Sequence, residues 1–226
     1  MEDVAEYKTK KSSDSELIDF CIDLETLGTG HDAAVIEIAV VPFRLDGFKI
    51  SREDIGEPFD VFIDPTEYLF NKNFSITQDT IEWWQGNKAS QLMKYSIDNI
   101  GTTLTTAVRK LVYYLDDNLC AKGVTPRLWC QGTDFDIPIL KHLLLSEGYD
   151  FDSFIKHTQL RDARTMIFQC VEAVKGGYVE NPYSLLVPFE PTGDEADMPH
   201  MALYDASRTA NNLQQVYKMV KKRAYY

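Results

Sequence analysis

The sequence predicts an α/β protein in which one β-sheet is flanked by helices. Three apolar runs near the N-terminus are rich in Val, Ile and Ala and end at turn residues, a pattern typical of strands. Farther along the chain, apolar residues recur at helical spacing. A further short apolar run falls between the helical segments. Strands followed by helices that alternate with another strand indicate a sheet covered by helices.

Four strands are expected. The first two are separated by a Gly-containing turn over Gly28–Asp32 that fits a hairpin, and the third is stopped by Asp64 and Pro65. The predicted strands are Leu17–Leu24, Ala33–Phe43, Phe59–Ile63 and Leu128–Cys130. Periodicity does not give their order in the sheet.

Helices are expected mainly in the second half of the chain. One apolar stripe runs from Leu104 to Leu115, and another runs from Leu203 to Val216. Further helices are predicted over Ile137–Ser146 and Arg161–Val174. A helix also opens at Thr80, which is a candidate N-cap.

With 226 residues, the chain fits a single domain that can bury a core. The polar residues 1–16 are expected to form a flexible extension, and residues 17–226 are expected to form the domain. The sequence shows neither an apolar stretch of membrane-spanning length nor the layout of a signal peptide, so a cytoplasmic protein is expected. Four scattered cysteines indicate neither a zinc cluster nor a disulfide framework.

The formal net charge of −12 argues against a protein that holds nucleic acid on a broad basic surface. It does not exclude an enzyme that grips a few terminal nucleotides through metal ions. Weak, salt-sensitive binding is expected instead of tight, processive binding.

Two carboxylates separated by one residue end the first predicted strand. Because side chains alternate along a strand, Asp23 and Glu25 should lie on one face while Ile22 and Leu24 face the other way. Two acids at a strand end suggest a cation site. Taken alone, the pair would more often be a solvent-facing polar edge.

Two later motifs bring further acids. Asp136 lies in the run FDIPIL after a predicted strand, and Asp205 follows His200 by five residues near the C-terminus. Alone, Asp136 would be interpreted as a helix N-cap, and Asp205 as an acid favoured by the helix dipole in an early helical turn. Asp134 is a nearby alternative to Asp136.

In this order, the DxE, FD and H-x4-D motifs resemble the DEDDh branch of the DnaQ-like 3′-to-5′ exonucleases. The likeness is closest to the exonuclease A group of the T-even phages, through IDxETxGxG, TIEWW, WCxGxxFDxPIL and RDxRT. It implies an RNase H-like mixed sheet flanked by helices, and a phage origin with action in the host cytoplasm. The FDxPIL pattern selects Asp136 over Asp134, and Met201 in place of Tyr argues against the tyrosine branch.

The resemblance implies hydrolysis of phosphodiester bonds from a 3′ end, aided by two Mg²⁺ or Mn²⁺ ions, with release of nucleoside 5′-monophosphates. Such ions, about 3.5 to 4 Å apart, are held by oxygen ligands. Asp23 would contact both ions, Glu25 and Asp205 the ion nearer the attacking water, and Asp136 would act through a bound water. His200 would be the general base, placed by a long loop over 178–199 and ordered by substrate and metal.

Four more residues are candidates by position. The resemblance implies that Thr26 and Leu27 hold the terminal nucleotide. It also implies that Asp162 supports the site from behind, although a surface salt bridge explains Asp162 equally well. Of the adjacent Trp83 and Trp84, which point about 100° apart on a helix, Trp84 is expected to pack in the core. For Trp83, stacking on a base and lining the binding groove both stay open.

Two classes of function remain open. The favoured one is an exonuclease acting on DNA, single-stranded by first choice, with an exoribonuclease or oligoribonuclease as its neighbour. The other is a non-catalytic nucleic-acid-binding module on the same fold. Such a module would not need to keep a costly cluster of like charges. The sequence indicates no membrane partner and no particular protein partner.

Overall fold

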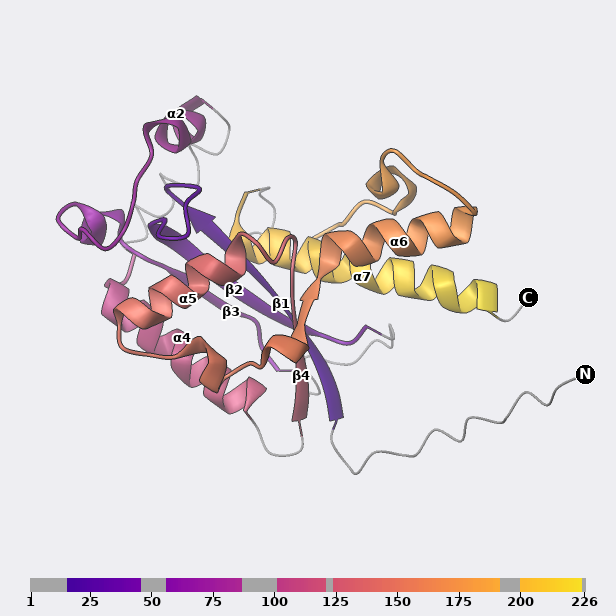
Figure 1. Cartoon of the computed structure of the whole chain (residues 1–226), viewed down its shortest axis with the longest axis horizontal. Helices are drawn as coiled ribbons and strands as arrows, with labels where there is room; N and C mark the ends of the chain where they lie inside the picture. Colours follow the sequence, from indigo (N-terminus) through magenta and orange to yellow (C-terminus); the bar gives the residue numbers. More distant parts are fainter. Residues whose placement is uncertain (1–15, 46–55, 87–100, 121–123, 192–199, 225–226) are drawn as a thin grey trace, which may run out of the picture.

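The computed structural model describes residues 16–45, 56–86, 101–120, 124–191 and 200–224. These form a mixed five-stranded sheet of order β3-β2-β1-β4-β5 (Figure 1). The first three strands make an antiparallel meander, while β4 runs parallel to β1 and β5 runs parallel to β4. The strands are β1 Glu16–Thr26, β2 Val35–Phe43, β3 Phe59–Phe62, β4 Val124–Cys130 and β5 Leu160–Asp162.

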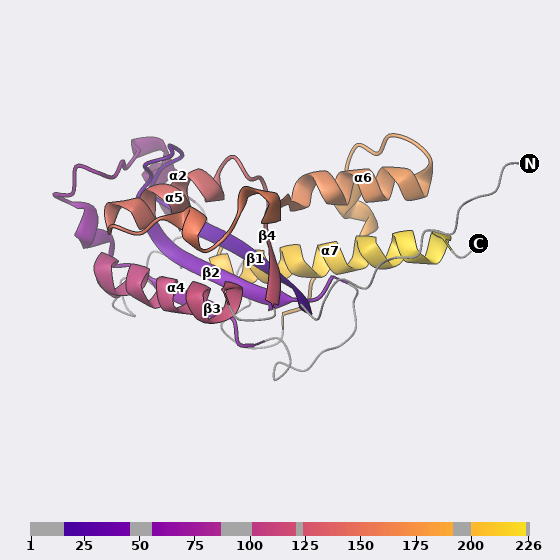
Figure 2. The same ribbon diagram turned by 60° about the horizontal axis from the view of Figure 1, so that its bottom comes forward.

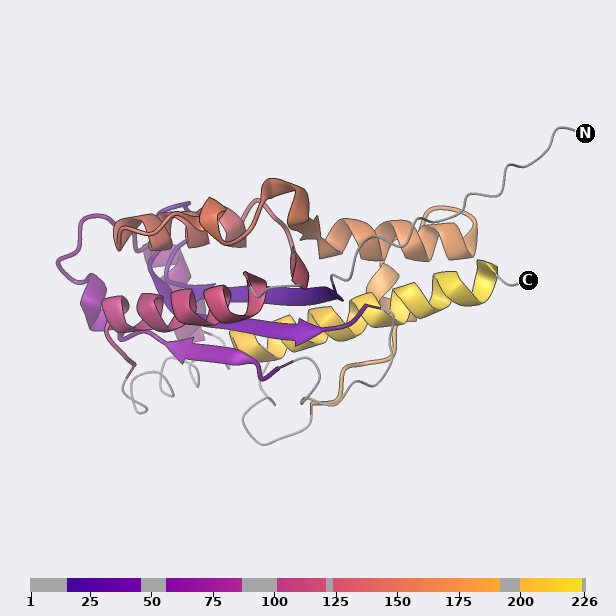
Figure 3. The ribbon, with the colours of Figure 1, turned by 90° about the horizontal axis from the view of Figure 1, so that it is seen from below.

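Helices cover both faces of the sheet, as predicted. In Figure 3, α4 and α5 lie on one side of the strands and α7 lies on the other. Figure 2 shows α6 extending beside α7, against which it packs. The helices are α2 Gln78–Gly86, α4 Leu104–Leu119, α5 Asp136–Ser146, α6 Ala163–Lys175 and α7 Ala202–Ala224. Short 3-10 helices are Pro65–Tyr68, Phe151–Ser153, His157–Gln159 and Pro182–Leu185.

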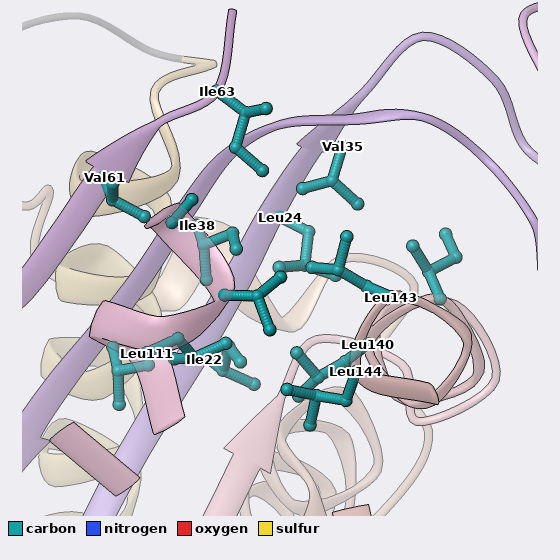
Figure 4. Close-up of a cluster of buried hydrophobic side chains, with 14 of the residues drawn as sticks. Ile22, Leu24, Val35, Ile38, Val61, Ile63, Leu111, Leu140, Leu143 and Leu144 are labelled. Carbon is teal, nitrogen blue, oxygen red and sulfur yellow. The ribbon is translucent and has the colours of Figure 1, made fainter. Parts of the chain in front are cut away.

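Alternation along β1 divides its side chains between two cores. Ile22 and Leu24 join the larger core beside Ile38, Leu111 and Leu140 (Figure 4). Each such buried side chain stabilises the fold by about 1.5 to 3 kcal/mol. The opposite face of β1 faces α7 and contributes to a second core, which β4 and α6 also help to form. Its buried residues include Cys21, Trp129, Ile167, Val171, Ala206, Ala210, Leu213 and Val216. Asp23 and Glu25 continue that second face.

A buried carboxylate interrupts the second face near the start of β1. Asp19 is 1 % exposed and accepts from Arg127 Nε at 2.7 Å and Nη2 at 2.6 Å, and from Trp129 Nε1 at 2.6 Å. The backbone N–H of Leu45 donates to Asp19 Oδ2 at 3.2 Å. With its oxygens satisfied in this way, the charge is tolerated in the interior. This network fixes β4 against β1 at the end of the strand away from Glu25.

Several predicted boundaries were wrong. The fourth strand, expected over Leu128–Cys130, begins at Val124. The helix expected to begin at Arg161 begins at Ala163, because 160–162 pair with β4 as the short strand β5, which was missed. The helix expected to open at Thr80 starts at Gln78, and the Thr80 hydroxyl lies 2.8 Å from that of Thr77. The expected extension, apart from Glu16, lies outside the described residues. Among the helices that are described, none has the length and apolarity to cross a membrane.

Candidate active site

Three carboxylates from two distant segments converge at the end of β1. Oxygen atoms of Asp23, Glu25 and Asp205 all lie within 4.8 Å of one another. The first two project from one face of β1, as the alternation predicted. The third sits in the first turn of α7, whose N-terminus reaches the same end of β1. A cluster of oxygen ligands at this spacing is suited to a hard divalent cation.

Asp136 joins the cluster from the start of α5. Strand β4 pairs with β1 only as far as Cys21, so the backbone beyond that residue has no strand neighbour on this side. The N–H of Leu24 donates instead to Asp136 Oδ1 at 3.2 Å. Interpreted alone, Asp136 was a helix N-cap, but that position belongs to Phe135, which makes no side-chain cap bond. Asp136 therefore binds β1 and is 4 % exposed.

The carboxylates raise one another's proton affinity. Burial, then Asp136 and Glu25, raises the pKa of Asp23 well above its ordinary value. Burial and the charge of Asp205 raise the pKa of Glu25 from 4.5 to about 8. Burial also raises the pKa of Asp136 from 3.8 to about 7. Because four neighbouring carboxyl groups cannot all be ionised without a compensating charge, the cluster favours the binding of protons or of cations.

The guanidinium of Arg208 lies beside Asp205. Its Oδ1 lies 2.9 Å from Arg208 Nη2, an ion pair without the geometry of a hydrogen bond. Burial raises the pKa of Asp205, and the charge of Arg208 opposes that shift. A buried carboxylate oxygen that lacks a hydrogen-bond donor is a position where a cation fits.

His200 is close to the cluster but turned toward an indole. It is exposed, and its ring lies 4.9 Å from that of Trp83 in an edge-to-face arrangement. Its φ of 69° is the sole positive value found for a non-glycine residue in the described parts of the chain. A left-handed backbone costs an L-residue about 1 to 2 kcal/mol. Strain of this kind is concentrated at functional sites.

A pocket of about 380 Å³ opens beside Glu25. Trp83, 42 % exposed, forms part of its wall, whereas Trp84 is 1 % exposed and confirms the expected packing role. The Trp84 indole N–H donates to the carbonyl of Thr26 at 2.9 Å. The pocket is lined by Leu24, Glu25, Thr26, Gly28, Thr29, Asp79, Thr80, Trp83, Trp84 and Phe135.

Leu27 does not reach this pocket. Its side chain is 3 % exposed within the larger core. Its N–H donates to the carbonyl of Ala34, and its carbonyl accepts from Thr77. The chain turns inward directly after Thr26, so the Leu27 side chain points into the core. The expected contact of Leu27 with the terminal nucleotide stays a prediction.

The family model described as the 3′-5′ exoribonuclease Rv2179c-like domain matches residues 19–217. The chain belongs to this family. The match includes the parts of β1, α5 and α7 that carry the acid cluster. The chain is accordingly a 3′-5′ exonuclease of the DnaQ-like type, as the sequence motifs indicated.

Comparison with individual proteins agrees with this assignment. The chain is 29 % identical over 172 residues to the exodeoxyribonuclease of Enterobacteria phage T4, covering 67 % of this chain and 71 % of that protein. Exonuclease I of E. coli, solved with single-stranded DNA, matches with a TM-score of 0.57 at 12 % identity. Exonuclease I of Methylocaldum szegediense matches with a TM-score of 0.57 at 16 % identity.

These structural matches confirm the RNase H-like fold. Each covers 92 % of this chain but 41 % of the exonuclease I chain. The chain thus spans about two fifths of the length of those enzymes. At such identities the likeness extends to the fold, so the roles of single residues depend on the geometry described above.

Asp162 lies between the start of α6 and the turn before α5. Its support of the catalytic site stays a prediction. Asp162 caps α6 by accepting from the N–H of Thr165 at 2.6 Å, and it also accepts from the N–H of Thr133 at 3.1 Å. The pKa of Asp162 is lowered, because these hydrogen bonds outweigh its partial burial. The second bond holds the turn at Gly132, whose φ of 117° favours glycine, and so sets where α5 begins.

One buried acid near the site was missed by the sequence analysis. Glu37 is fully buried in β2, opposite Glu25 in the strand register, and its Oε1 accepts from the N–H of Leu203 at 3.4 Å. It thereby holds the start of α7, and with it Asp205, against the sheet. No pattern in the sequence separates this Glu from a surface residue. The docking of α7 explains why Glu37 is buried.

Proposed function

We propose that the chain is a divalent-metal-dependent exonuclease that hydrolyses the terminal phosphodiester bond at a 3′ end and releases nucleoside 5′-monophosphates. The observation that carries this proposal is the meeting of Asp23, Glu25 and Asp205 within 4.8 Å of one another. Asp136 binds the same stretch of β1. Residues 17–226 would work as one catalytic domain.

The donor set fits two Mg²⁺ or Mn²⁺ ions. Asp23, Glu25 and Asp205 would hold them, and Asp136 would contribute through a water, since its Oδ1 is engaged by Leu24. The fit rests on crowded carboxylates with raised pKa values and on the buried Oδ1 of Asp205 that has no hydrogen-bond donor. When bound, such ions activate a water and stabilise the charge of the leaving oxygen.

His200 is proposed as the general base. An imidazole that titrates near neutrality can take the proton from the attacking water. Its backbone lies five residues before Asp205, and its charge stabilises the ionised form of that acid. In the structure its ring packs edge-to-face against Trp83, so the proposed role requires the side chain to turn toward the carboxylates. Catalytic hydrogen bonds often form fully only with substrate present.

The 380 Å³ pocket is proposed to receive the 3′-terminal nucleoside. It opens beside Glu25, and its apolar wall includes Trp83, on which a base of any identity could stack. Thr26 also lines the pocket, and its hydroxyl donates to the carbonyl of Gly28 at 2.6 Å. The indole N–H of Trp84 holds the carbonyl of Thr26.

Single-stranded DNA is the first proposed substrate, because the T4 relative is an exodeoxyribonuclease and the E. coli neighbour was solved with single-stranded DNA. RNA is a second candidate, because the matching family is described as exoribonucleolytic. A protein distinguishes the two through the 2′-hydroxyl.

The test uses DNA and RNA oligomers of one sequence, labelled at either end, with Mg²⁺ or with EDTA. Loss of single nucleotides from the 3′ end in Mg²⁺ alone is expected, and the faster polymer identifies the substrate. Asp23→Asn should abolish turnover, while the control Asp134→Asn, which changes an exposed acid two residues before Asp136, should retain it. His200→Ala should lower kcat more than metal affinity. A wild-type protein that binds oligomers without shortening them would establish a non-catalytic module instead.

A further inference from the structure

A second pocket lies between the end of β4, the segment after α6 and the second and third turns of α7. Its volume is about 340 Å³, and polar side chains from Gln131, Tyr183, Arg208 and Asn212 line it together with Leu186, Val187, Pro188 and Phe189. The exonuclease chemistry described above does not use this pocket. A polar wall opposite an apolar one is suited to a nucleotide.

Arg208 joins this second pocket to the acid cluster. Its guanidinium lies 2.9 Å from Asp205 Oδ1 and also lies over the ring of Tyr204, with 5.6 Å between its Cζ and the ring centroid. The side chain is 38 % exposed, so a ligand can reach it. A single cationic group therefore faces both the carboxylates and the pocket.

The polar wall is held in place by hydrogen bonds. Gln131 Nε2 lies 3.4 Å from the hydroxyl of Tyr183, and Thr209 donates to Gln131 Oε1 at 3.1 Å. Arg164 Nη2 donates to the carbonyl of Gln131 at 3.0 Å. Two arginines thus approach this wall from α6 and α7, in a protein whose net charge is −12. Their charges counteract the rise in the pKa of Tyr183 that burial causes.

The contacts place the acid cluster between the two pockets. The first pocket touches Glu25, which lies in the acid cluster with Asp205. Asp205 in turn pairs with Arg208, which lines the second pocket. The acid cluster therefore connects the two pockets. A strand whose terminal nucleoside fills the first pocket would place its scissile phosphate at the cluster and its next nucleotide beyond it.

We propose that the second pocket binds the nucleotide on the 5′ side of the scissile bond, and that Arg208 contacts the phosphate that precedes the scissile one. This inference rests on the proposed function. Without a metal, Arg208 balances the charge of Asp205. If the carboxylates held a cation, the charge of Asp205 would be balanced without Arg208, and the guanidinium would be available for a phosphate. Arginine suits this task because its planar fork matches phosphate oxygens.

The test compares a dinucleotide, which has only the scissile phosphate, with the trinucleotide that adds one more. The wild type should cleave the trinucleotide about tenfold more efficiently in kcat/KM. Arg208→Gln should remove most of that preference. The control Arg109→Gln makes the same charge change on an exposed residue of α4, on the opposite face of the sheet, and should keep it. Arg208→Lys should restore part of the preference.

The same contact can also be tested by changing the substrate. Replacing the upstream phosphate of the trinucleotide by an uncharged methylphosphonate should cost the wild type about tenfold in kcat/KM and cost Arg208→Gln little. Equal losses on the dinucleotide and the trinucleotide in Arg208→Gln would show that Arg208 acts only through Asp205, and would overturn the inference. So would a wild type indifferent to the methylphosphonate. A wild type inactive on both substrates in Mg²⁺ would refute the proposed function itself.

Discussion

Neutralising Glu25 should stabilise the metal-free protein at alkaline pH. Folding raises the pKa of this carboxyl from 4.5 to about 8, because the site is buried and Asp205 lies close by. Below pH 4.5 the group is protonated in both states and the shift has no effect. Between the two pKa values, the unfolded chain is ionised while the folded chain holds its proton. Stability then falls by up to about 1.4 kcal/mol per pH unit as the pH rises.

The expected magnitude follows from the same shift. Multiplying the difference between the two pKa values by about 1.4 kcal/mol gives an upper limit of about 5 kcal/mol. Partial exposure and the coupling to Asp205 reduce it, so a gain of about 2 kcal/mol is expected for Glu25→Gln at pH 8.

Urea unfolding in EDTA measures this gain. Glu25→Gln should exceed the wild type clearly at pH 8 and by much less at pH 5.5, while Glu180→Gln, a change at an exposed residue, should follow the wild type at both. A Glu25→Gln protein no more stable than the wild type at pH 8 would show that the carboxylates do not repel one another as described.

Three further predictions concern the metal and the supports of the site. Mg²⁺ at about 100 times its Kd should stabilise the wild type by about 2.7 kcal/mol at pH 8, measured by urea unfolding, and Asp23→Asn should lose this gain. Asp162→Ala should lower the free energy of unfolding by about 1 to 2 kcal/mol, because α6 loses its cap. It should also lower kcat, because the turn at Thr133 loses its hydrogen bond. Asp162→Asn should retain most of the stability. Trp84→Phe should cost about 1 kcal/mol and raise KM more than it lowers kcat, because the N–H that holds the carbonyl of Thr26 is lost; an unchanged KM would separate that bond from substrate binding.

The acid cluster could be predicted because each of its parts has a local signal. Strand alternation placed Asp23 and Glu25 on one face, and short motifs marked Asp136 and Asp205. The resemblance to a known superfamily then selected these acids from the other 31 Asp and Glu residues of the chain's 35. Their meeting depends on contacts between distant segments. The sequence alone states no such distance.

The features that were missed depend on long-range contacts. Strand β5 has three residues, too few to show a period, and exists only because β4 offers an edge to pair with. Glu37 and Arg208 acquire their roles from the docking of α7, and Asp19 acquires its role from Arg127 on another strand. Leu27 lies in the core because the chain turns inward directly after Thr26, which no pattern in the sequence indicated.

The most direct test of the metal site is anomalous diffraction from crystals of the full chain containing Mn²⁺ and a nucleoside 5′-monophosphate. Mn²⁺ peaks are expected within coordination distance of Asp23, Glu25 and Asp205, with Asp136 linked through a water. Peaks elsewhere on the protein, with none among these carboxylates, would contradict it.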